Sequence, residues 1–158
     1  MLKLIEKRPI LTIIVVALLL LLPNLNALEV SIMEARNFIS AREMLTDGNW
    51  ILTTLNGEAR YQKPPLPTWL TALSALVLGI GNIWALRLPA ALMVVLLGVG
   101  VFKLSRKLTL SKVQSLINGL VVITSLYVIL IIFEAPWDIF AHTFMSVSYT
   151  HLTLPTKA

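Results

Sequence analysis

The sequence predicts an all-α integral membrane protein from its composition, the lengths of its apolar runs and the placement of its charges. Of its 158 residues, 57% are hydrophobic and only 13% are charged, whereas soluble domains average about a quarter charged. Several apolar runs approach the roughly 20 residues that cross a bilayer. Basic residues flank these runs, so the net charge of +5 indicates anchoring among membrane lipids and no nucleic-acid partner.

The first apolar run, residues 10–28, is predicted to be a membrane span that is retained. Lys7 and Arg8 precede it, and no small-x-small cleavage site follows it before the charged loop. Basic residues before a first span favour a cytoplasmic N-terminus. The loop of residues 31–63 is then expected on the extracytoplasmic side.

Three further apolar runs, residues 65–81, 83–102 and 113–133, decide the topology. If all three crossed the membrane, the basic cluster between the last two would lie outside, against the excess of Lys and Arg in cytoplasmic loops. The run 65–81 is the shortest and carries Trp69, a residue type favoured at the lipid–water boundary. We therefore predict about three spans, with 65–81 as an interfacial helix and Asp138 on the same face as the first loop.

Two short elements are predicted inside that first loop. Apolar residues recur at helical spacing over residues 34–46, which predicts an amphipathic surface helix. Ser31 and Glu34 have the spacing of a capping box, and an Asp-Gly pair follows the run as a stop signal. Asn56 and Gly57 predict a tight turn between two short extended segments.

Two cations of the loop are candidates for binding an anionic head group. Lys63 precedes Pro64 and Pro65, which stiffen the chain and hold the ammonium near the interface. An ammonium there pairs well with phosphate, and the alternative is a lysine that snorkels at a helix end. Arg36 is likewise either a fork for phosphate or a residue of a solvated helix face.

Two carboxylates are the candidates for acid–base chemistry. Glu34 suits a general base or a carboxylate ligand, and its place in the capping box gives an equally good structural interpretation. Asp138 follows the run 113–133, where a carboxylate is either a boundary residue or part of a site. His142 lies one helical turn later, but one Asp and one His indicate a metal site only weakly. No cofactor is predicted with certainty, and the absence of cysteine excludes thiolate ligands.

Seven short motifs follow one another between residues 34 and 90. They are Glu34-Ala35-Arg36, Ala41-Arg42-Glu43-Met44, Gly48-Asn49-Trp50, Leu55-Asn56-Gly57-Glu58, Lys63-Pro64-Pro65-Leu66, Trp69-Leu70 and Arg87-Leu88-Pro89-Ala90. This series resembles the start of the polyprenyl-phosphate-sugar glycosyltransferases, which include the aminoarabinose transferase of lipid A and the protein O-mannosyltransferases. The family shares the GT-C architecture, a multi-span helical bundle. The resemblance covers residues 1–145, as the N-terminal part of that transmembrane domain.

The resemblance implies an enzyme that transfers a hexose or pentose from a polyprenyl-phosphate-linked sugar to a lipid or protein acceptor. It implies a multi-pass protein of the plasma (inner) membrane that reacts on the extracytoplasmic face. By the same resemblance, Arg36 and Lys63 bind the donor phosphate, and Glu34 or Asp138 is the catalytic carboxylate.

The chain departs from the family pattern at two positions. Met33 stands where the family has an Asp, so the base is either Glu34 or Asp138. Gln62 replaces the Glu that usually precedes Lys63, so a divalent metal is only weakly supported here.

The tail, residues 146–158, loses the apolar character that a further span should have. It resembles translated sequencing-adapter read-through and is predicted to be non-native, with a polar external tail as the alternative. A product truncated there is expected to be inactive alone. The alternative function for the chain is a small non-catalytic membrane protein or transporter fragment whose loop only anchors at the interface.

Overall fold

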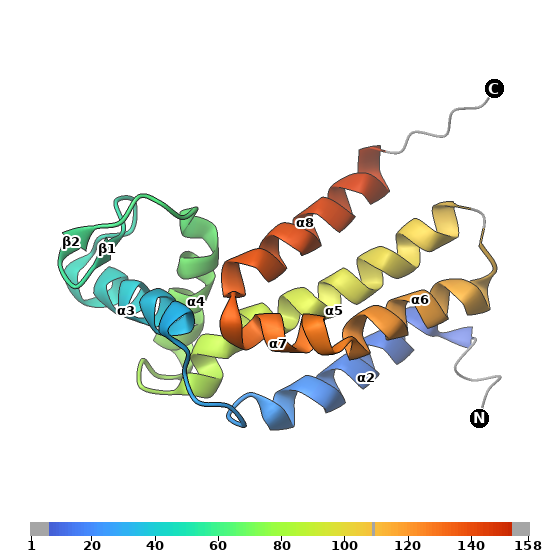
Figure 1. Ribbon diagram of the computed structural model, residues 1–158, viewed down its shortest axis with the longest axis horizontal. Coiled ribbons are helices and arrows are strands. Elements are labelled where there is room, and N and C mark those ends of the chain that lie inside the picture. Colours follow the sequence, from blue (N-terminus) through green and yellow to red (C-terminus); the bar gives the residue numbers. More distant parts are fainter. Residues whose placement is uncertain (1–6, 109, 153–158) are drawn as a thin grey trace.

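The computed structural model describes residues 7–108 and 110–152, the last two of them as backbone only, and most of these residues are helical (Figure 1). An elongated bundle contains α2 (Pro9–Leu21), α5 (Ile83–Lys107), α6 (Lys112–Thr124), α7 (Leu126–Glu134) and α8 (Pro136–Leu152). A 3-10 turn, η1 (Leu22–Asn24), follows α2. At one end of the bundle lie α3 (Ile32–Asp47), the strands β1 (Thr54–Leu55) and β2 (Glu58–Ala59), and α4 (Pro65–Leu78).

The predicted helix, its N-cap at Ser31 and the turn are found in the first loop, but the capping box is only half formed, because the Glu34 carboxylate is bonded to Arg87. The Ser31 hydroxyl accepts a hydrogen bond from the Glu34 backbone N–H, and Gly48 ends α3 in the left-handed region at φ +76°. Asn56 and Gly57 both have positive φ, +55° and +78°, as a type I′ turn requires. They join two antiparallel strands of two residues each. Glu43 secures this hairpin to α3, because its carboxylate accepts hydrogen bonds from the β1 residue Thr54 and the turn.

The lengths of the helices do not confirm the predicted count of about three spans, which stays a prediction. Within the described residues, α5 is the one unbroken helix that is long and apolar enough to cross a membrane. The pair α6 and α7 passes the same test together, with a bend of 42° between them. Helices α2, together with η1, and α4 are apolar but shorter.

The predicted run 113–133 is broken at Ser125, whose backbone is extended. The hydroxyl of Thr124 donates back to the carbonyl of Leu120 at 2.9 Å. Such back-bonding competes with the helical ladder and bends helices. This side-chain hydrogen bond lies directly before the break, and apolar periodicity does not reveal it.

Helix α5 contains Pro89, which cannot donate the hydrogen bond that the carbonyl of Ala85 would receive in a regular helix. The hydroxyl of Ser74, on α4, donates to that carbonyl at 2.6 Å. A backbone group freed by proline is thus satisfied from a neighbouring helix, as an apolar environment demands.

The centre of the bundle is packed closely where α2, α5 and α6 meet. A Cβ atom added to Gly98 would lie 2.4 Å from a side-chain carbon of Ile123, and one added to Gly119 would lie 2.7 Å from Ile13. Glycine lets helix backbones approach each other in this way. The surrounding core is apolar and includes Ala17, Val94, Leu97 and Leu116.

The buried face of α3 differs from its apolar stripe. It includes three polar residues, Glu34, Asn37 and Ser40, beside Ala41 and Met44. Each of the three has a partner, as buried polar groups require. The Asn37 amide, for example, donates to the Thr71 hydroxyl and accepts from the Thr68 hydroxyl, at 3.0 and 2.8 Å, and so joins α3 to α4.

Candidate functional site

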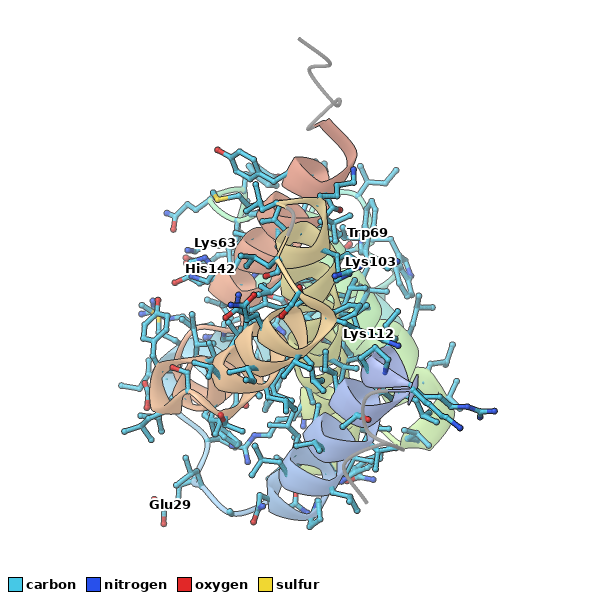
Figure 2. The ribbon with its side chains drawn as sticks, turned by 90° about the vertical axis from the view of Figure 1, so that its right-hand side faces the viewer. Glu29, Lys63, Trp69, Lys103, Lys112 and His142 are labelled. Carbon is cyan, nitrogen blue, oxygen red and sulfur yellow. The ribbon has the colours of Figure 1, made fainter. Side chains whose placement is uncertain are left out.

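Charge is distributed unequally between the two ends of the bundle. The loop end, which comprises the segment between α2 and α3, α3 itself, β1, β2, α4 and the junction of α7 with α8, carries every acidic residue of the described chain. Among the described residues, the charged side chains of the opposite end are all cations, and we call it the Lys103 end; they are Lys7, Arg8, Lys103, Arg106, Lys107 and Lys112. Figure 2 looks onto that end and labels Lys103 and Lys112. All four candidate residues belong to the loop end.

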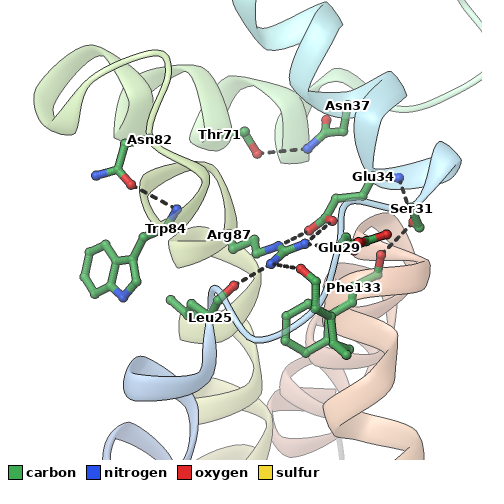
Figure 3. Close-up of polar contacts among 11 residues, drawn as sticks. Leu25, Glu29, Ser31, Glu34, Asn37, Thr71, Asn82, Trp84, Arg87 and Phe133 are labelled. Atoms are coloured by element: carbon green, nitrogen blue, oxygen red, sulfur yellow. Dashed lines mark hydrogen bonds and ion pairs between the residues drawn. The ribbon is translucent and has the colours of Figure 1, made fainter.

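Glu34, the first candidate, forms a buried ion pair with Arg87 of α5 (Figure 3). Its two carboxylate oxygens accept hydrogen bonds from Nε and Nη2 of Arg87 at 2.6 and 2.7 Å. Both residues are 1% exposed. This bidentate geometry is the strong form of the Arg–carboxylate contact.

Arg87 uses its remaining hydrogen-bonding capacity on the segment between α2 and α3. Nη1 donates to the carbonyls of Leu25 and Leu28 at 2.5 and 2.9 Å, and Nη2 to that of Glu29 at 3.3 Å. Its guanidinium also lies 4.9 Å from the ring centroid of Phe133. One side chain therefore connects α5 with the α2–α3 segment, α3 and α7.

Burial raises the pKa of Glu34 above its ordinary value, and the hydrogen bonds and charge of Arg87 oppose that shift. Both oxygens are occupied, so the geometry supports a positioning role. The predicted catalytic role of Glu34 stays a prediction.

The second region of the site is built on the indole ring of Trp137, the second residue of α8. The guanidinium carbon of Arg60 lies 4.9 Å from the ring centroid, and Nζ of Lys63 lies 5.6 Å from it. Both distances are in the range of cation–π attraction. Cations from the first loop thus meet the start of α8.

Arg36 joins this group through the backbone. Nη1 of Arg60 donates to the Arg36 carbonyl at 2.9 Å and approaches the Ser40 hydroxyl at 3.4 Å. The Arg36 side chain is exposed, and its Nη1 lies 3.7 Å from the sulfur of Met33. We call Arg36, Arg60 and Lys63 the cation cluster.

Asp138 directly follows Trp137 and is the third residue of α8. Its side chain is exposed, and a carboxylate there is favourable to the helix dipole. Within the described residues, no group of three His, Asp or Glu side chains could hold a metal ion. The ring of His142 instead lies near Tyr127, with 3.5 Å between Nε2 and the phenol oxygen.

The structure places Lys63 over the ring of Trp137, which directly precedes Asp138 in the chain, and connects the Arg36 backbone to the same ring through Arg60, whereas Glu34 lies in a separate buried pair. Sequence reasoning missed Arg60, Arg87 and Trp137 as parts of this region. Arg87 was visible as an arginine four residues inside an apolar run, where an unpaired charge is costly.

Comparison with known proteins agrees with the resemblance. Residues 62–157 match the family model described as dolichyl-phosphate-mannose-protein mannosyltransferase, which is more than half of the chain. The chain belongs to this family. The match begins one residue before Lys63 and includes Arg87, Trp137 and Asp138, and the predicted relationship to GT-C glycosyltransferases is thereby confirmed.

Curated proteins that resemble this chain align with it over only part of their length. The chain is 35% identical over 82 residues to an uncharacterized protein of Aquifex aeolicus, which is 52% of this chain and 16% of that protein. It is 34% identical over 95 residues to the undecaprenyl phosphate-alpha-4-amino-4-deoxy-L-arabinose arabinosyl transferase of Edwardsiella ictaluri, 60% of this chain and 17% of that protein. The chain thus spans about a sixth of the length of these relatives. No solved structure matches it.

The predicted division between residues 1–145 and a non-native tail, 146–158, stays a prediction. Residues up to Leu152 belong to α8, and residues 153–158 lie outside the described part.

Proposed function

We propose that this chain supplies the donor-phosphate side of a membrane glycosyltransferase. The reaction is transfer of a sugar from a polyprenyl-phosphate donor to a lipid or protein acceptor. The single observation that carries the proposal is the position of Lys63 and Arg60 over the ring of Trp137, the residue that directly precedes Asp138 in the chain. Membership of the family supports the reaction class.

Lys63 and Arg36 bind the lipid phosphate in this proposal. When the bond between the sugar and the phosphate breaks, negative charge develops on the departing phosphate oxygens. Cations already fixed at that place stabilise this charge without reorganising. Both side chains are exposed and available to a ligand.

Asp138 is proposed as the carboxylate that accepts the proton from the acceptor hydroxyl. It is exposed, and among the described residues it has no ion-pair partner. Glu34, which is held by Arg87, is the competing assignment for the base, and its geometry favours positioning over proton transfer. A single displacement of the phosphate would invert the configuration at the sugar carbon.

The membrane orientation is part of the proposal. The Lys103 end is expected on the cytoplasmic side because cytoplasmic segments carry the excess of Lys and Arg. The loop end, with the cation cluster, is then extracytoplasmic. The interfacial position of α4 is supported by its length of 14 residues and by Trp69 near its start.

The proposal is tested by expressing the complete gene that encodes this chain and measuring sugar transfer from labelled polyprenyl-phosphate sugar. Lys63→Ala and Asp138→Asn should each reduce turnover by about a hundredfold, the effect of removing one preorganised transition-state group. Lys112→Ala, at the Lys103 end, is the matched control and should leave turnover unchanged. Unchanged turnover in both site variants would overturn the residue assignment, and a product that retains the donor's anomeric configuration would overturn the single displacement. Absence of any transfer would favour the non-catalytic alternative.

A further inference from the structure

We infer that Arg60 is a third phosphate-binding residue of this site and that Trp137 is the platform that positions Arg60 and Lys63 for one phosphate group. This inference rests on the proposed donor site. It adds Arg60, which the sequence motifs did not indicate, to the phosphate-binding residues. It also assigns a positioning role to the buried Trp137 ring at the start of α8.

The guanidinium of Arg60 is fixed from two directions. Trp137 lies against it, with 4.9 Å between the guanidinium carbon and the ring centroid, and Nη1 donates to the Arg36 carbonyl at 2.9 Å. Within the described residues, Nε and Nη2 have no hydrogen-bond partner. A planar guanidinium that is anchored through one nitrogen can still offer the other two to a tetrahedral oxyanion.

The backbone of Arg60 is held as firmly as its side chain. Its N–H donates to the carbonyl of Thr53 at 2.8 Å, and its carbonyl accepts from the Thr53 hydroxyl at 2.5 Å. Thr53 directly precedes β1, and Arg60 directly follows β2. The hairpin therefore fixes the backbone of Arg60, and the contacts of its guanidinium restrict its side-chain rotamers. Little side-chain entropy is then lost when a ligand binds.

The charge of the cluster lacks an internal counterpart. Among the described residues, the one ion pair is that between Glu34 and Arg87, so Arg36, Arg60 and Lys63 are not neutralised by carboxylates. Burial and the nearby charge of Arg36 lower the pKa of Arg60. Like charges held together are relieved by a bound anion, and a phosphate ester supplies the oxygens that both side-chain types prefer.

Trp137 sets the spacing of the two cations. Its side chain is 7% exposed, so the ring is fixed by packing, while Arg60 and Lys63 approach it from the loop. Lys63 alone is a point charge on a flexible stem. Because both side chains lie against the Trp137 ring, the Lys63 ammonium is held near the planar guanidinium of Arg60. This arrangement favours binding of both cations to a single phosphate group over separate contacts with different lipid head groups.

The ligand chemistry is a phosphate monoester or diester, which a polyprenyl phosphate, a bilayer phospholipid and free phosphate all present. The test uses the 158-residue chain in phosphatidylcholine nanodiscs and measures binding of undecaprenyl phosphate. Undecaprenol, nanodiscs that contain phosphatidylglycerol, and inorganic phosphate form the comparison arms. We expect saturable binding of undecaprenyl phosphate that undecaprenol does not show and that neither phosphatidylglycerol nor millimolar phosphate abolishes.

Arg60→Gln should weaken that binding about tenfold, the loss of one charge-assisted contact, and Arg60→Lys should restore part of it. Arg42→Gln, which removes an exposed arginine of α3 outside the cluster, is the matched control. Equal affinity in Arg60→Gln and Arg42→Gln would overturn the role of Arg60. If Lys63→Ala still abolished binding in that case, the proposed donor site would stand without Arg60. Failure of the wild-type chain to bind would overturn the inference, whereas sugar transfer by the complete protein would still decide the proposed function.

A spectroscopic readout separates phosphate contact from loss of folding. The chain is labelled with 5-fluorotryptophan, and the Trp137 resonance is identified by its absence in Trp137→Phe. Adding undecaprenyl phosphate should shift this resonance in the wild type and less in Arg60→Gln, with the Trp84 resonance as an internal control for folding. A shift that is unchanged by Arg60→Gln would show that Arg60 does not connect the phosphate to the ring.

Discussion

Both ends of the bundle are rich in cations, but they hold them in different ways. At the Lys103 end the charged side chains are exposed, and Arg106 and Lys107 contact main-chain carbonyls near helix ends. At the loop end, Arg60 and Lys63 face one indole ring, and Arg87 is buried with a carboxylate. The number of positive charges therefore says less about a site than the groups that fix them.

The largest effect is expected from breaking the buried pair of the loop end. Arg87→Met should destabilise the protein by about 3–5 kcal/mol, because it leaves the Glu34 carboxylate buried without a partner. Chemical denaturation in detergent micelles would measure this. The control is Lys103→Met, which removes an exposed cation and should cost much less. A loss below that of the control would show that the pair does not hold the loop end together.

The next largest effect is expected on the orientation of the protein in the membrane, when cations of the Lys103 end are removed. Changing the four cations at the junction of α5 with α6, Lys103, Arg106, Lys107 and Lys112, to Gln should weaken the preference for the predicted orientation by about 1 kcal/mol per charge. A topology reporter fused to the hairpin would detect molecules with the opposite orientation. Changing Arg36, Arg60 and Lys63 to Gln is the matched experiment, and it should not reverse the orientation. If both sets acted alike, the two ends would not differ in this respect.

A smaller effect is expected where α2, α5 and α6 pack closely, between the two ends of the bundle. Gly119→Val should destabilise the bundle by about 1–3 kcal/mol, since its side chain would overlap Ile13 and the added methyl groups have no room. Gly81→Ala is the control, because a Cβ at Gly81 meets nothing within 4 Å. Equal thermal midpoints for the two variants would contradict close packing at this level.

The smallest expected effect is a dependence of stability on pH at the loop end. Burial raises the pKa of Glu34, so its carboxyl binds a proton more tightly in the folded than in the unfolded protein. The contribution of this group to folding is therefore fully present below the ordinary carboxyl pKa and is lost as pH rises through the folded-state pKa. Glu34→Gln should remove that slope from a series of denaturation curves. An unaltered slope would assign it to other carboxyls.

Sequence reasoning succeeded where the determinants are local. The N-cap at Ser31 and the turn at Asn56 depend only on residues close to them in the sequence, and both are found in the structure. The partner of Glu34 was missed because Arg87 lies 53 positions away, and only tertiary packing brings them together. The role of Trp137 was hidden for the same reason, since its contacts come from a loop more than seventy residues earlier.

The hydrogen bond from Ser74 to the Ala85 carbonyl has a mechanical consequence for α5. Pro89 leaves that carbonyl without its helical donor, so the local shape of α5 depends on a hydroxyl supplied by α4. If α4 moved away, the carbonyl would have to turn toward water or another donor, and the helix would bend at that point. The conformation of the first turns of α5 therefore depends on whether α4 is packed against them. Arg87 lies two residues before the proline, so a bend there would also displace the segment between α2 and α3 to which Arg87 is hydrogen-bonded.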